Sequence, residues 1–140
     1  MRYISRSHPD RDVAIYTMTG PFSIEETLRM IDEVADRTGT GPAHAVVVDA
    51  REQTTAPSAD ETSRIVGRLL GRRLHRRLAI VVAAAAGYGM GRKLAAEAAL
   101  NGLDVEVFTE LDEAVDWAAA AGGAADGRGG GRGGGRPPGP

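Results

Sequence analysis

The sequence predicts a single layered α/β domain in which an N-terminal β-hairpin is followed by alternating strands and helices. Short apolar runs alternate with longer stretches whose apolar residues recur at helical spacing, in the order β-β-α-β-α-β-α-β-α. The chain has 140 residues, a usual length for one domain. This alternation is typical of a largely parallel sheet with right-handed crossovers.

The N-terminal segment predicts the hairpin. Residues 3–8 and 13–19 flank residues 9–12, where proline and aspartate favour a turn. Apolar side chains occur on both faces of the second strand, so we expect both faces of the sheet to be covered. They are Val13 and Ile15 on one face and Ala14, Tyr16 and Met18 on the other.

The first two helices are each predicted to begin at a capping box. In this motif a serine hydroxyl accepts a hydrogen bond from the N–H three residues on, and the glutamate there reaches back to the serine N–H. The pairs are Ser23 with Glu26 and Ser58 with Glu61. The first helix is expected to end near Arg37.

Three further apolar runs predict strands. Residues 44–50 and 78–85 are rich in alanine and branched aliphatic residues, as in buried parallel strands, and the third run surrounds Val105. A glycine-rich turn is expected to open the third helix, and the last helix is expected to start at Thr109 or Glu110.

The composition limits the partners and the compartment. Residues 122–140 contain no aliphatic residue larger than alanine and no aromatic residue, so a disordered Gly/Arg/Pro-rich tail is expected after a domain of residues 1–121. The formal net charge of the chain is −2. The tail contributes +2, so the domain carries −4, and nucleic acid is not an expected partner. The chain has no cysteine, no signal-peptide pattern and no apolar run of membrane-spanning length, so we expect a cytoplasmic protein.

Three segments carry a family resemblance. They are AVVVDAR at residues 45–51, RRLAIVVA at 76–83 and VEVFTELDEAVDWAAA at 105–120. Together they resemble the SpoIIAA-like division of the STAS superfamily. In that division the last segment is typically a strand followed by a phenylalanine and then by a short helix that contains a Glu-Ala pair and a tryptophan. The matching residues here are Phe108, Glu113, Ala114 and Trp117.

The resemblance implies a SpoIIAA/STAS-like fold and a non-enzymatic regulatory module that binds a protein partner. Some STAS domains are regulated by Ser/Thr phosphorylation, and others bind small apolar or nucleotide ligands. The Asp-Ser doublet of the anti-sigma-factor antagonists is replaced here by Asp49-Ala50. A carrier for a small apolar or lipid-like ligand is the alternative reading and an enzyme is the third. No cofactor is expected, and the oligomeric state is left open.

The loop of residues 49–58 is the first candidate site. It follows a predicted central strand, and ligands of open α/β sheets bind at the carboxyl ends of strands. The candidate binding or phospho-acceptor residues are Asp49, Arg51, Thr54, Thr55 and Ser58. Alternatively, Ser58 only caps a helix, the threonines fill the loop and Asp49 accepts hydrogen bonds from loop N–H groups.

The second candidate is the glycine-rich turn, whose backbone N–H groups could approach an anion or nucleotide. Its residues are Gly87, Gly89, Gly91, Arg92 and Lys93. The spacing is neither a Walker A motif nor G-x-G-x-x-G. The alternative is a tight connection between a strand and a helix.

The third candidate is a cluster of arginines on the second helix. Arg64, Arg68 and Arg72 are four residues apart and share a helix face, and Arg73 follows them. Guanidinium groups bind carboxylates and phosphates, so this face is a candidate docking surface for an acidic partner. The alternative is a solvated helix face placed favourably near a helix C-terminus.

Two remaining groups of residues are ambiguous. His8, His44 and His75 lack the spacing of metal ligands, and no metal site is expected. Leu111, Val115 and Trp117 lie at helical spacing, where they either line an apolar ligand pocket or form part of the core.

Overall fold

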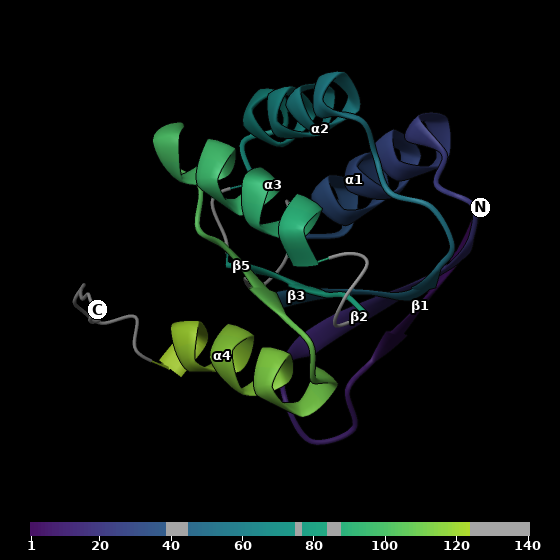
Figure 1. The fold of residues 1–140 in the computed structure, drawn as a ribbon. Coiled ribbons are helices and arrows are strands. Elements are labelled where there is room, and N and C mark those ends of the chain that lie inside the picture. The colour runs from purple at the N-terminus through teal and green to yellow at the C-terminus, as the bar shows by residue number, and fades with distance from the viewer. Residues whose placement is uncertain (39–44, 75–76, 84–87, 124–140) are drawn as a thin grey trace.

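A computed structural model describes residues 1–38, 45–74, 77–83 and 88–123 (Figure 1). The order of elements is the predicted one. The elements are β1 (Arg2–Ser7), β2 (Val13–Gly20), α1 (Ile24–Thr38), β3 (Ala45–Gln53), α2 (Ala59–Gly71), β4 (Leu78–Val81), α3 (Tyr88–Leu100), β5 (Val105–Phe108) and α4 (Leu111–Gly123).

The five strands form one sheet in their sequence order, β1-β2-β3-β4-β5. β1 is antiparallel to β2, and the pairs β2–β3, β3–β4 and β4–β5 are parallel. Each parallel connection moves one strand further in the same direction. Right-handed crossovers therefore put α1, α2 and α3 on the same face. In the part of the chain that the structure describes no strand follows α4, and this helix covers the opposite face (Figure 1).

The core lies on both sides of the sheet, as the alternation in β2 predicts. Tyr16 and Met18 are buried in a cluster with residues of α1. Val13 and Ile15 are buried in a cluster with residues of α4. The period-two alternation of a strand thus supplies apolar side chains to both layers.

Two predicted strand ends are wrong. β3 was expected to end at Ala50 but continues to Gln53, because a bulge lets it stay paired with β2 from Thr17↔Asp49 to Gly20↔Gln53. The N–H of Thr54 then donates to the carbonyl of Gly20 at 2.8 Å. The strand predicted over residues 78–85 ends at Val81, where its ladders with β3 and β5 also end. Residues 84 and 85 lie outside the described part.

The helix ends follow the predicted signals with one correction. At α2 the capping box is complete, with Glu61 N–H donating to Ser58 Oγ at 3.1 Å and Ser58 N–H donating to Glu61 Oε1 at 2.9 Å. At α1 only half of the box forms. Glu26 N–H donates to Ser23 Oγ at 3.2 Å, but the Glu26 carboxylate pairs with Arg29 instead of reaching back.

The C-terminal helix runs past the expected end of the domain. The domain was expected to end at residue 121, whereas α4 continues through Gly123. The tail expected from residue 122 falls otherwise on residues 124–140, which lie outside the described part.

Candidate functional site: an apolar cavity under three helices

A cavity of about 190 Å³ lies between the sheet and helices α1, α2 and α3. Apolar side chains from both layers line it, including Met30 of α1, Leu69 of α2, Leu94 of α3 and Ile80 of β4. Figure 1 shows these three helices arrayed over the same face of the sheet. The cavity is thus enclosed by elements far apart in the sequence.

The way the helices cover the sheet explains the unfilled volume. On the opposite face, α4 lies close against β3, β4 and β5. In the described part of the chain, α2 packs against α1 and α3 but makes no comparably close approach to a strand. Ala50 and Gly91 add little or no side chain to the lining. Helices and sheet together thus leave a space that the side chains of neither layer fill.

The mouth of the cavity lies at the carboxyl ends of the strands. Among the lining residues, Thr54, Thr55 and Ala56 after β3 and Ala83 after β4 are exposed. At the other end of the sheet the lining residues are buried, as Leu103 is, or half-buried, as Arg77 and Leu78 are. Ligands of open parallel sheets bind at the carboxyl ends of the strands. The structure thus places part of the predicted loop at this mouth.

Asp49 and Arg51, the first two residues predicted for that loop, lie elsewhere. Val48 lines the cavity, so the next side chain in the strand, that of Asp49, points to the opposite face. Arg51 donates to it through Nε at 2.9 Å, Nη2 at 2.8 Å and the backbone N–H at 3.1 Å. Burial would raise the pKa of Asp49, but these hydrogen bonds outweigh it and hold the pKa below its ordinary value. The pair braces the bulge of β3.

The three predicted hydroxyl groups have different environments. Ser58 Oγ caps α2, and Thr55 Oγ1 accepts a hydrogen bond from Phe22 N–H at 2.8 Å. The Thr54 side chain is exposed and forms no hydrogen bond with the described residues. Of the three predicted phospho-acceptors, Thr54 is therefore the one whose hydroxyl neither caps a helix nor bonds a loop N–H among the described residues.

The described residues of the glycine-rich turn have different surroundings. Gly91 packs toward the core, where a Cβ atom would lie 2.9 Å from Val107 Cγ1. Gly89, Arg92 and Lys93 are exposed, and the Arg92 guanidinium lies 5.9 Å from the Tyr88 ring centroid. Gly87 lies outside the described residues. Gly91 allows a close approach of α3 and β5, as the alternative interpretation of this segment predicts.

The expected docking surface is divided by ion pairs. Arg68 Nη1 lies 2.6 Å from Asp32 Oδ2, and Arg72 Nη2 lies 2.5 Å from Asp36 Oδ1, so both guanidinium groups bind carboxylates of α1. Arg64 and Arg73 are exposed and form no ion pair with the described residues. Arg68 and Arg72 thus hold α2 to α1 and are not presented together with the other two arginines.

The apolar residues predicted on the last helix pack in the core, and His8 accepts a local hydrogen bond. Val115 is buried in the cluster beneath α4, and Leu111 and Trp117 pack against it. None of the three lines the cavity, which is on the other face of the sheet, and all three pack in the core as the alternative interpretation predicts. His8 Nδ1 accepts a hydrogen bond from Asp10 N–H at 3.1 Å. His44 and His75 lie outside the described residues.

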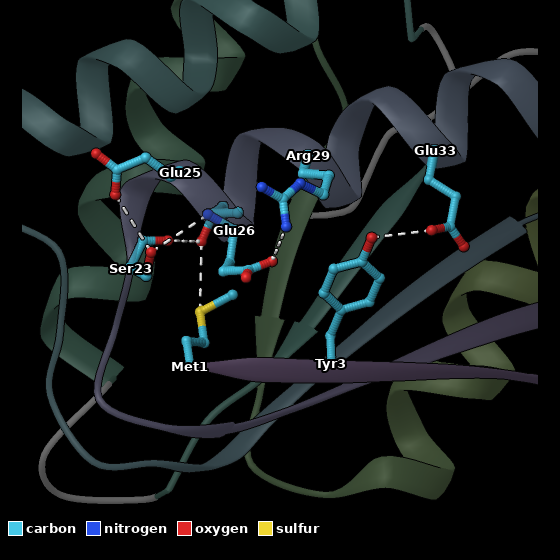
Figure 2. Close-up of polar contacts among 8 residues, drawn as sticks. Met1, Tyr3, Ser23, Glu25, Glu26, Arg29 and Glu33 are labelled. Atoms are coloured by element: carbon cyan, nitrogen blue, oxygen red, sulfur yellow. Dashed lines mark hydrogen bonds and ion pairs between the residues drawn. The ribbon is translucent and has the colours of Figure 1, made fainter.

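Sequence reasoning missed the contacts that attach the first strand to the cavity wall. Figure 2 shows Tyr3 of β1 pointing at α1, where its hydroxyl donates to Glu33 at 2.8 Å. Thr27, which lines the cavity, donates its hydroxyl proton to the Ser23 carbonyl at 2.8 Å, and its Oγ1 lies 3.6 Å from Met1 Sδ. β1 thereby anchors the helix that supplies Met30 to the lining. Tyr3 and Glu33 are 30 residues apart, and no short-range pattern links them.

Two kinds of feature are absent from the described residues. Among these residues, no group of three or more histidine, aspartate and glutamate side chains is placed to hold a metal ion. No helix in the described ranges is both long and apolar enough to cross a membrane.

A sequential five-stranded sheet with an antiparallel edge strand, three helices on one face and a fourth on the other has the SpoIIAA-like fold. A solved structure supports this assignment: an uncharacterized protein of the DUF3478 family with a SpoIIAA-like fold, from Shewanella loihica PV-4. The two share 15% sequence identity with a TM-score of 0.57, over 84% of this chain and 92% of that one. No protein-family model and no curated protein matches the sequence.

Proposed function

We propose that this SpoIIAA-like domain binds a small apolar molecule in the cavity beneath α1, α2 and α3. The observation that carries the proposal is a cavity of about 190 Å³ lined by apolar side chains and reached from the carboxyl ends of the strands. Binding sites for small molecules are concave and mostly apolar, with a few polar groups that orient the ligand. The proposed role is binding and not catalysis.

The volume indicates the size of the ligand. An engineered apolar cavity of ~150 Å³ binds benzene. A cavity of about 190 Å³ therefore suits one ring with a small substituent, or a short branched chain. A long lipid chain would need the helices to move apart. Of the two expected ligands, a small apolar molecule therefore fits better than a lipid-like one.

Energetics also favour an occupant. Apolar side chains that line unfilled space lack packing partners, which costs stability. A bound apolar molecule would restore the lost contacts and stabilise the folded state.

Native mass spectrometry of the gently purified protein, together with thermal unfolding in the presence of toluene, tests the proposal. We expect a small organic adduct that is lost on denaturation and a melting temperature raised by several degrees at saturating toluene. Ala50→Leu should abolish the toluene shift, because Ala50 lines the cavity. Ala96→Leu, at an exposed position of α3, is the matched control and should leave the shift intact. No shift in the wild type would refute the proposal.

A regulatory, protein-binding role is the second candidate. The observation in its favour is an exposed apolar residue on the edge strand of the sheet. Ile4 of β1 is 69% exposed. Phosphate regulation of such a role would fall on Thr54, whose exposed hydroxyl forms no hydrogen bond with the described residues. Ile4→Ser should then lose a protein that co-purifies with the wild type, whereas Ala96→Ser should keep it. Identical co-purifying proteins for both variants would remove this candidate.

A further inference from the structure

The charge in the cavity lining faces away from the cavity. Arg77 is the charged residue among the described lining residues, and its guanidinium is held by groups at the rim of the sheet and on α4. Nε donates to Asp104 Oδ2 at 3.1 Å, and Nη1 donates to the backbone carbonyl of Trp117 at 2.9 Å. Its Cζ lies 4.5 Å from the centroid of the Trp117 ring. Since α4 covers the other face of the sheet, the described lining offers no ionic partner to a ligand inside.

The mouth, in contrast, carries neutral hydrogen-bonding groups. Gln53 lines the cavity at the end of β3, and its Nε2 donates to the carbonyl of Thr55 at 3.0 Å. Its Oε1 accepts no hydrogen bond from the described residues. Thr55 Oγ1 accepts from Phe22 N–H at 2.8 Å, which leaves the hydroxyl proton available to donate. One acceptor and one donor therefore lie together at the exposed end of an apolar cavity.

We infer that the ligand of this cavity is uncharged and places a single neutral polar group, such as a hydroxyl or an amide, against Gln53 and Thr55. This inference rests on the binding function proposed above and specifies its ligand class. The apolar body of the ligand lies among Met30, Leu69 and Ile80, and its polar group lies at the mouth. Gln53 and Thr55 orient the ligand and discriminate among ligands of the same shape.

Two physical arguments select this class. An ionised group buried without a partner is strongly unfavourable, so a carboxylate or ammonium in this lining would bind poorly. A site with its own unpaired polar groups rejects an analogue that lacks the matching group, because those groups lose water without gaining a partner. The preferred ligand therefore has a hydrogen-bonding group and no charge.

Four probes with the same ring test the inference: toluene, benzyl alcohol, benzoate and benzylammonium. Their dissociation constants are measured at neutral pH on the full chain by protein-observed NMR. We expect benzyl alcohol to bind at least threefold more tightly than toluene, and both to bind at least tenfold more tightly than the two ions. Gln53→Leu should bring the alcohol down to the affinity of toluene without weakening toluene.

The control variant is Glu52→Gln, at the neighbouring exposed position of β3, which should leave all four affinities unchanged. Equal binding of benzoate and benzyl alcohol would overturn the inference, as would an unchanged alcohol-to-toluene ratio in Gln53→Leu. Either result, with toluene bound, leaves the binding function standing. Failure of all four probes to bind would overturn both the inference and the proposed function.

Discussion

Gly91 of α3 lies against the side chain of Val107 of β5, so close that a Cβ on the glycine would sit 2.9 Å from Val107 Cγ1. This contact lets the start of α3 approach the edge of the sheet. Further along the same layer, α2 is not held against a strand in the same way, and the cavity opens there. The contact between Gly91 and Val107 and the looser packing of α2 thus lie in the same helical layer over the sheet.

Gly91→Ala should destabilise the protein by about 1–3 kcal/mol, because the added methyl group overpacks the contact with Val107. Gly89→Ala is the matched variant, since nothing lies within 4 Å of its Cβ position. It should be neutral or gain up to ~1 kcal/mol from helix propensity. Urea unfolding of both variants measures the difference, and equal stabilities would contradict the described contact.

The ion pair between Asp32 and Arg68 should couple α1 to α2 by about 0.5 kcal/mol, since both side chains are more than a third exposed. A double-mutant cycle with Asp32→Ala and Arg68→Ala measures this coupling by urea unfolding. It should fall in 1 M salt, where exposed charges are screened. A coupling of zero at low salt would show that the pair does not hold the helices together.

Asp49 should make stability depend on acid pH. Arg51 lowers its pKa in the folded state, so the ionised pair stabilises the fold above the ordinary pKa of about 4. This contribution is lost as the pH falls through the folded-state pKa. The stability difference between wild type and Asp49→Asn, measured by urea unfolding, should therefore be full at neutral pH and shrink below about pH 4. A difference of the same size at pH 3 and pH 7 would be inconsistent with the pair.

Tyr3 should titrate late at alkaline pH. Burial and the hydrogen bond to Glu33 raise the pKa of Tyr3 to about 12. The folded state thus favours the neutral phenol, and its contribution to stability, present below pH ~10, is lost as the pH rises towards 12. Ultraviolet titration should show a late phenolate transition that loses amplitude in Tyr3→Phe, since the buried Tyr16 also has a raised pKa, and that shifts to lower pH in Glu33→Gln. A transition unmoved by Glu33→Gln would exclude the contact as a cause.

Local patterns were sufficient for the order of the elements and for most of their bounds. The alternation in β2 placed Ile15 and Tyr16 on opposite faces, and the structure has them there. The capping box at Ser58 was complete in the sequence and is complete in the structure. These features depend on neighbours within four residues, so a single sequence contains the information. The extension of β3 to Gln53 does not, because it depends on pairing with Gly20 across a bulge.

The candidate site was likewise predictable from the sequence only in part. The loop after β3 was singled out, and Thr54 and Thr55 lie at the mouth of the cavity. The cavity itself was not foreseen, since its walls join side chains as distant as Met30 and Leu94. Arg68 and Arg72 were correctly placed on one helix face, but their partners lie on α1, and no pattern within α2 reveals them.

The sequence by itself determined the class of fold, the alternation of strands and helices and the residues that each face would bury, because these follow from periodicity, capping and turn chemistry. Only the tertiary structure decided how closely each helix approaches the sheet, which arginines are paired and where volume is left unfilled. Those outcomes depend on the sizes and distances of side chains brought together from separate elements, and packing at that range leaves no local trace in the chain.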